Sequence, residues 1–195
     1  MNTDGLTLVN FEILESQESN LETTMKNSTA SEFSHSSYSS LLFKSLTASD
    51  VEALLLPFYL GLDFEARRRR FGGGVSDDAI RQHCHKLNLD NAVVLVCSGK
   101  TGVIAAIELH PLGSDWEDTE LALAECAKAD RATIVAHLLQ LAAFAAGKRG
   151  CATFVIPSCS SERDYIELLR GMGRVRMHAD LLRLELGEYV SLHRR

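Results

Sequence analysis

Residues 119–156, TELALAECAKADRATIVAHLLQLAAFAAGKRGCATFVI, contain the order of elements that decides the fold. Apolar and polar residues alternate in the first half of 118–127. This alternation predicts a strand with Leu121 on one face and Glu120 on the other, because side chains of a strand point alternately to its two sides.

A long helix and a second strand follow directly. Apolar residues recur at helical spacing over 129–150, and glycines stand near the end of that run. The continuous apolar run at 151–157 is typical of a strand buried on both faces. A helix that crosses over between two strands of one sheet predicts that the strands are parallel.

The remaining elements are marked by capping residues, glycines and one proline. Residues 41–47 read as a strand, and 47–62 as a helical region that Pro57 bends or splits, since proline cannot donate to the preceding turn. The three glycines after FEARRRRF predict the end of a helix, and Ser76 is the predicted N-cap of the next helix. Further along the chain, we predict a hairpin over 91–111 that turns at 98–100, a helix over 160–173 and a strand over 179–188. The predicted order is β-α-α-β-β-β-α-β-α-β.

The length and composition fit one globular domain with a tail. The chain has 195 residues, of which 46% are hydrophobic, enough to build a core. Its 20 basic against 26 acidic residues give a net charge of −6, which argues against a general nucleic-acid binder. No apolar run approaches the roughly 20 residues of a membrane span, and no secretory signal pattern opens the chain. We therefore expect a cytoplasmic protein with no membrane partner.

The two ends of the chain differ from its middle. Residues 16–40 are dominated by Ser, Thr, Asn and Glu, so we expect 1–40 to be a flexible tail, with a short strand or docking segment at 6–14. The predicted domain covers 41–188, and 189–195 form a C-terminal tail.

The cysteines and histidines suggest no metal site. The chain has five cysteines, an odd number, and three of them lie in strand-like apolar runs, which favours reduced, buried thiols. His83, Cys84 and His85 are adjacent on a predicted helix and project about 100° apart, so they cannot all reach one ion.

Several short segments between about Leu41 and Leu186 resemble sequences of the GCN5-related N-acetyltransferase (GNAT) superfamily. RRRFGGGVSDDAIRQH, VIAAIELHP, TELALA before the long helix and KRGCATFVI after it are similar, in this order, to bacterial members that include protein-acetyltransferase domains. The resemblance implies an α/β (α+β) fold with a mixed, mostly antiparallel central sheet and helices on both faces. It also implies acetyl-coenzyme A (acetyl-CoA) as cofactor, in a V-shaped gap between strands 119–126 and 151–156.

In that family the start of the long helix receives the pyrophosphate through the motif Gln/Arg-x-x-Gly-x-Gly/Ala. Here the motif falls on the cofactor-binding candidates Asp130, Arg131, Ala132, Thr133, Ile134 and Val135. None of the three signature positions is kept, and β-branched residues at both glycine positions would stand where the pyrophosphate approaches. Arg131 and the free N–H groups of the helix start could still bind a phosphate. In the alternative, Asp130 caps the helix and no ligand is bound.

Amine acetylation needs a base for the attacking ammonium. The resemblance implies a carboxylate on a central strand, so the catalytic candidates are Glu108, Glu120 and Glu125, with Glu120 best placed by analogy. Each is also an ordinary strand residue. The tyrosine that serves as acid in many members would fall at Leu169, and Tyr165 lies one helical turn too early.

Arg67 to Arg70 form the only dense basic run. Four consecutive arginines on a helix cannot face one partner, and we expect some of them to pair with neighbouring acids. Recognition of an acidic substrate or a nucleic acid is the alternative.

Two functions of different class remain open. The first is an acetyl-CoA-dependent N-acetyltransferase whose acceptor is an amine of a small molecule or a protein lysine. The second is a catalytically inactive domain of the same fold that acts as a sensor or binds a protein partner. A homodimer is compatible with both.

Overall fold

The computed structural model describes residues 41–125, 131–157, 163–178 and 181–187, and only the backbone of residues 131, 163 and 164. All of these residues belong to the unit Tyr38–Arg195. The predicted tails at 1–40 and 189–195 lie outside the described residues.

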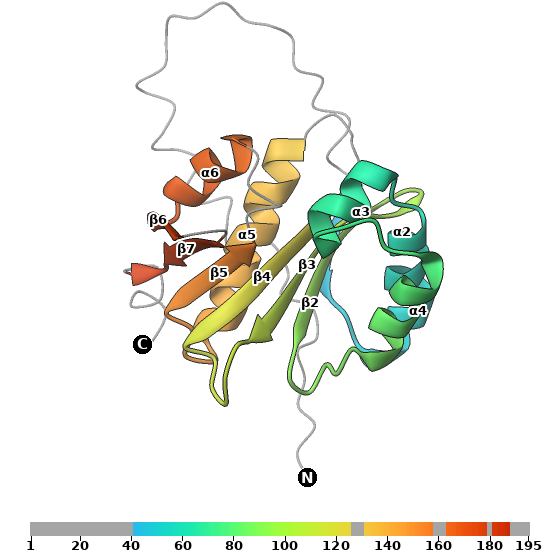
Figure 1. Ribbon diagram of the computed structural model, residues 1–195, viewed down its shortest axis with the longest axis horizontal. Helices are drawn as coiled ribbons and strands as arrows, with labels where there is room; N and C mark the ends of the chain where they lie inside the picture. The colour runs from blue at the N-terminus through green and yellow to red at the C-terminus, as the bar shows by residue number, and fades with distance from the viewer. Residues whose placement is uncertain (1–40, 126–130, 158–162, 179–180, 188–195) are drawn as a thin grey trace, which may run out of the picture. The chain divides into compact units, whose positions relative to one another are not determined.

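A mixed sheet of seven strands forms the centre of the described domain, in the order β1-β2-β3-β4-β5-β7-β6 (Figure 1). Every neighbouring pair is antiparallel except β4 and β5, which are parallel, as the crossover helix predicts. The strands are β1 (Leu42–Ser45), β2 (Val93–Gly99), β3 (Gly102–Pro111), β4 (Asp118–Glu125), β5 (Thr153–Pro157), β6 (Arg174–His178) and β7 (Leu181–Glu185).

The helices are α1 (Ala48–Asp50), α2 (Leu56–Leu60), α3 (Phe64–Phe71), α4 (Asp77–Lys86), α5 (Arg131–Gly147) and α6 (Arg163–Arg170). Between α1 and α2, residues Val51–Leu55 form a π-helical turn in which the Leu56 N–H donates to the Val51 carbonyl. Pro57 follows directly at the start of α2, where its missing N–H is tolerated. The predicted disturbance takes the form of a π-helical turn directly before α2, within one continuous helical region.

Local signals set the limits of α3 and α4. The Asp63 side chain accepts a hydrogen bond from the Ala66 N–H and caps α3. Gly72 ends that helix at a φ of 76°, a left-handed conformation that glycine adopts without steric cost. The Ser76 hydroxyl accepts from the Ala79 N–H and caps α4, as predicted.

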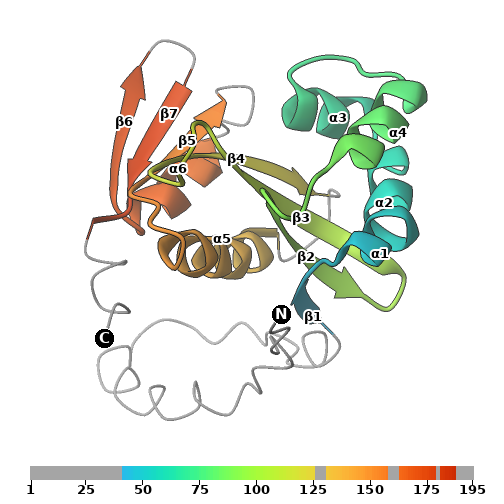
Figure 2. The same ribbon diagram turned by 90° about the horizontal axis from the view of Figure 1, so that it is seen from below.

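The helices cover both faces of the sheet (Figure 2). On one face, α2, α3 and α4 pack over β2, β3 and β4, and we call this the α2–α4 face. On the opposite, α5–α6 face, the two C-terminal helices pack over apolar side chains of β2 to β5 and β7. Leu121 and Leu123 lie on the α5–α6 face, and the strand alternation predicted for β4 is confirmed.

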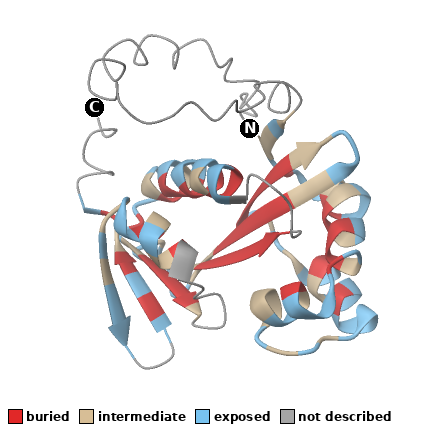
Figure 3. Cartoon of the chain, turned by 90° about the horizontal axis from the view of Figure 1, so that it is seen from above, coloured by how far each residue is buried: buried red, intermediate tan, exposed pale blue. Residues whose placement is uncertain are grey.

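β6 is an edge strand that the sequence pattern does not predict. Most of its residues are exposed (Figure 3), and among the described strands it pairs with β7 alone. Its sequence, RVRMH, has only two apolar residues, Val175 and Met177, and so lacks the run of β-branched or aromatic residues that marks a strand. Pairing with β7, rather than local propensity, determines its conformation.

β4 and β5 separate after a short contact. Their parallel pairing covers only Asp118–Glu120 of β4 and Thr153–Val155 of β5. β4 continues to Glu125 while it remains paired to β3 along its other edge. From Leu121 onward the two strands therefore no longer pair, and Figure 1 shows them splaying apart.

Candidate functional site

The three candidate carboxylates of β3 and β4 lie in different surroundings. Cross-strand register places Glu108 and Glu120 on the α2–α4 face, opposite Ala122 and His110 respectively. Glu125 ends β4 and has the side-chain direction of Leu123, on the α5–α6 face. The sheet therefore does not bring the three carboxylates together.

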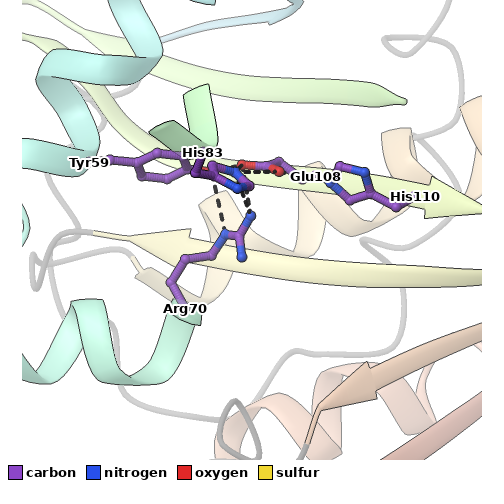
Figure 4. Close-up of polar contacts among 5 residues, drawn as sticks. All are labelled: Tyr59, Arg70, His83, Glu108 and His110. Carbon is purple, nitrogen blue, oxygen red and sulfur yellow. Dashed lines mark hydrogen bonds and ion pairs between the residues drawn. The ribbon is translucent and has the colours of Figure 1, made fainter. Parts of the chain in front are cut away.

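Glu108 is completely buried at the centre of a polar cluster (Figure 4). Arg70 of α3 forms an ion pair with its Oε1 at 2.8 Å, and the hydroxyl of Tyr59 of α2 donates to the same oxygen. His83 of α4 lies with its Nε2 at 3.1 Å from both carboxylate oxygens. His110 of β3 places its Nε2 2.8 Å from Oε2. Three helices are thus connected to the sheet through one carboxylate.

This cluster keeps Glu108 ionised. Burial alone would raise its pKa, but the charge of Arg70 and the contacts with His110 and His83 hold the pKa well below its usual range. Burial also lowers the pKa of Arg70, and the charge of Glu108 overcomes that effect and raises it. Burial and the nearby Glu108 charge raise the pKa of Tyr59 well above its usual value, so its hydroxyl remains a donor. A carboxylate held in this way is a weak base and a strong structural counter-ion.

Glu120 has the opposite surroundings. It is only partly buried, and it has no hydrogen-bond or ion-pair partner among the described residues. In the register it stands between His110 of β3 and Val155 of β5. It is the last residue of β4 that pairs with β5, so it lies where the gap opens.

Glu125 lies at the far end of the same gap. It is 5% exposed and accepts a hydrogen bond from the hydroxyl of Tyr165 on α6. A small hollow borders this contact and is lined by Ala66, Arg69, Leu123, Ala124, Glu125 and Tyr165. Residues of both sheet faces line it because β5 no longer covers this edge of β4. The Tyr165 contact connects α6 to the outer end of β4.

The start of α5 only partly fits the steric argument from the sequence. Asp130 lies outside the described residues, as does the side chain of Arg131, while Ala132 and Thr133 are exposed. Ile134 and Val135 are buried in the core of the α5–α6 face, at 8% and 0% exposure. Of the two β-branched residues at the glycine positions, Thr133 is therefore exposed and Val135 is enclosed in the core. Its side chain points into the core because it lies on the apolar stripe of α5.

The arginine run is divided among several partners. Arg67 pairs with Asp77 at 2.6 Å and Arg68 with Glu65 at 3.2 Å, so the expected pairing with neighbouring acids is confirmed for both. Arg70 is different because its guanidinium is 7% exposed and pairs with Glu108, 38 residues away in the sequence. Nothing local in the sequence distinguishes Arg70, although a glutamate inside the apolar run VIAAIELHP is a signal that a buried cation has to exist nearby.

Three cysteines are described, and all are buried free thiols: Cys84, Cys97 and Cys151. Burial raises the pKa of Cys84 and of Cys97 to about 11, so both are protonated at neutral pH. Cys126 and Cys159 lie outside the described residues. Within the described ranges, no helix is long and apolar enough to cross a membrane.

Comparisons with known proteins identify the architecture. The sequence matches no family model. It also matches no curated protein. Solved structures do match. The GNAT domain of S. lividans PAT is similar over 73% of this chain and 88% of its own, with a TM-score of 0.58 and 19% identity.

Two further structures have the same fold. A GNAT superfamily phosphinothricin acetyltransferase from Sinorhizobium meliloti, in complex with acetyl-CoA, matches 76% of this chain and 90% of its own, with a TM-score of 0.56 and 12% identity. A ribosomal-protein-alanine N-acetyltransferase from Brucella melitensis matches 73% of this chain and 96% of its own, with a TM-score of 0.52 and 18% identity. The central sheet with its diverging β4 and β5 and its helices on both faces thus has the fold of the GCN5-related N-acetyltransferases.

Proposed function

We propose that the domain is an amine N-acetyltransferase in which Glu120 is the base and acetyl-CoA is the donor. The observation that carries the proposal is the state of Glu120: a partly buried carboxylate without a partner among the described residues, at the point where β4 and β5 separate. A general base needs an unengaged lone pair within reach of the acceptor amine.

The surroundings of the other two candidates argue against them as bases. Glu108 is fully buried and accepts from donors on three helices and one strand. Glu125 is 5% exposed and accepts from Tyr165. The donors around Glu108 stabilise its ionised form, so it has little tendency to take a proton. Glu125 is instead shielded from an acceptor amine by its burial and its contact with α6.

The inner part of the gap fits an extended donor arm. From Leu121 to Glu125, the edge of β4 that faces β5 has no ladder partner among the described residues, so backbone N–H and C=O groups on that edge can bind the amides of a linear cofactor. The outer part fits less well, because the Tyr165 hydroxyl contacts Glu125 there. That contact has to open when the donor binds.

The mechanism is direct transfer. Acetyl-CoA, when bound, supplies an activated acyl group as a thioester. Glu120 accepts a proton from the acceptor ammonium, which frees the nitrogen lone pair for attack on the acyl carbon. The partly buried position of Glu120 strengthens its attraction for the ammonium relative to water.

Titration calorimetry with acetyl-CoA tests donor binding. We expect micromolar binding by the full chain and tighter binding by Thr133→Gly, because only Thr133 of the two β-branched residues is exposed at the helix start. Val135→Gly is unsuitable as a loop variant, since it would create a core cavity.

Transfer is then measured as release of coenzyme A with phosphinothricin, Nα-acetyl-lysine and a peptide with an N-terminal alanine as acceptors. For whichever acceptor reacts, Glu120→Gln should lower kcat by about 10²- to 10⁴-fold, the usual contribution of a general base. An equal rate in this variant would contradict the assignment of Glu120.

A second function is favoured by the Tyr165–Glu125 contact. If that contact stays closed, the domain is an inactive sensor or partner-binding module, as its altered phosphate motif also suggests. No acetyl-CoA binding by the full chain, together with binding by Tyr165→Phe or Glu125→Ala, would support this function over the first. If these variants also do not bind acetyl-CoA, the altered motif at the start of α5 is the cause of the lost binding.

A further inference from the structure

His110 contacts the buried cluster and lies opposite Glu120 in the sheet. His110 and Glu120 are directly opposed Cα partners on β3 and β4, so their side chains share the α2–α4 face, with Cβ atoms about 4.5–5.5 Å apart. Glu108 lies two residues before His110 on the same strand and therefore on the same face. A carboxylate, an imidazole and a second carboxylate thus stand in sequence along this part of the sheet.

The contact with Glu108 fixes which nitrogen of His110 carries the proton. Glu108 is ionised and can only accept, and the His110 Nε2 lies 2.8 Å from its Oε2. The neutral imidazole therefore carries its proton on Nε2 and keeps the lone pair on Nδ1. About a third of the His110 side chain is exposed (32%), so the side chain contacts both solvent and the buried carboxylate.

We propose that His110 is a proton relay for Glu120 and that Glu108 is the positioning residue that orients it. This inference rests on the proposed acetyl transfer. Neither residue has to touch the acceptor, because both act through Glu120.

The proton balance is simple. The acceptor ammonium gives one proton to a Glu120 oxygen. The amine nitrogen then forms its bond to the acyl carbon as the carbon–sulfur bond breaks, and the second proton that the nitrogen loses on becoming an amide goes to the leaving thiolate, which departs as the thiol. Glu120 passes the proton to the Nδ1 of His110 and returns to its ionised state. The imidazolium that forms is stabilised by the Glu108 carboxylate at Nε2, and it later releases its proton to solvent.

The charged and titratable groups around His110 come from several elements. Glu108 lies on its own strand and Glu120 on β4, while Arg70, His83 and Tyr59 reach it through Glu108 from α3, α4 and α2. Of these, Glu120 is the group without a described partner, so it is the one free to exchange a proton with His110.

His83 provides a matched control. Its side chain is 29% exposed, close to the 32% of His110, and its Nε2 also contacts Glu108. It differs in position, because it belongs to α4 and has no register partner on β4. Loss of His83 therefore tests the effect of removing one contact from Glu108 without removing the neighbour of Glu120.

The first test needs no turnover. Nitrogen-15 spectra of histidine-labelled full chain should show both His110 and His83 as the Nε2–H tautomer. In Glu120→Gln the ring resonances of His110 should shift, while those of His83 should not. The proposed relay would be overturned, even in a protein without transferase activity, if His110 carried its proton on Nδ1 or if its resonances did not change in Glu120→Gln.

The second test is kinetic and uses the amine that reacts fastest in the coenzyme A release assay. His110→Gln should lower kcat by about 10- to 100-fold and change the acid side of its pH profile, with the acceptor KM within about twofold. His83→Gln should stay within about threefold of the original kcat. Equal losses in the two variants, or a change in KM alone, would contradict the relay. If the unmodified protein transfers nothing, the proposed function fails, and the spectra still decide whether His110 is coupled to Glu120.

Discussion

Glu108 and Glu120 are the same residue type on the same face of the sheet, one cross-strand row apart, and their surroundings are opposite. Glu108 is buried and accepts from Arg70, Tyr59 and two histidines, whereas Glu120 is partly buried and has no partner among the described residues. A buried carboxylate is tolerated only when donors compensate its lost hydration. Helices α2, α3 and α4, which lie over this face of the sheet (Figure 2), supply three of those donors, and β3 itself supplies His110. One carboxylate therefore supports the fold, and the other is available for chemistry.

The largest effect should come from removing the cation beside Glu108. Arg70→Met leaves a buried, uncompensated carboxylate, and we expect it to lower the free energy of unfolding by about 3–5 kcal/mol. Urea unfolding followed by far-UV circular dichroism measures the change. Arg68→Met is the control, since the Arg68–Glu65 pair is exposed and should contribute less than about 1 kcal/mol. A similar decrease in the free energy of unfolding in both variants would show that the buried pair contributes no more to stability than the exposed pair.

Removal of the neutral donor should have a smaller effect. Tyr59→Phe takes one hydrogen bond from Glu108 but leaves Arg70 and both histidines in place. A lost donor to a buried acceptor costs about 1–3 kcal/mol, and the same urea experiment should give a value in that range. A stability equal to that of the unmodified protein would mean that the remaining donors fully satisfy the carboxylate.

The pH dependence of stability distinguishes the two carboxylates further. The pKa of Glu108 in the folded state lies well below its usual value of 4.5, so the unfolded chain binds its proton first as the pH falls. The stabilisation is complete above about pH 4.5 and is lost toward the folded pKa, by at most about 1.4 kcal/mol per pH unit. In the double variant Glu108→Leu/Arg70→Met, the free energy of unfolding should lack this contribution to its decrease at acid pH. An identical acid profile in the two proteins would contradict the ionised state of Glu108.

The smallest effect is expected at Glu120. Glu120→Gln should change the free energy of unfolding by less than about 0.5 kcal/mol, because no described partner is lost. Glu108→Gln, which leaves Arg70 buried without a counter-charge, should destabilise the protein far more. Comparable losses from the two substitutions would remove the distinction between a structural and a functional carboxylate.

Elements with strong local signals were predictable from the sequence. The parallel β4 and β5 follow from two strands around one crossover helix, and the ends of α3 and α4 follow from Gly72 and Ser76. β6 was not predictable because its polar residues become a strand only through pairing with β7. The buried position of Val135 was missed because a motif compared by position does not say which way a helical side chain points.

The candidate site was likewise predictable only in part. The sequence supplied three carboxylates and favoured Glu120 by resemblance alone, and it gave no means to separate their environments. Arg70 lies 38 residues from Glu108 and Tyr59 lies 49, so no local pattern connects them.

By itself, therefore, the sequence determined the order of the strands and helices other than β6 and the alternation of faces along β4, because these depend on propensity and periodicity within short segments. The three candidate acids came from the family resemblance. Only the tertiary structure decided which carboxylate is enclosed, which is open, and that His110 stands between them. Those properties depend on packing and register between segments far apart in the chain, where burial determines the cost of each charge.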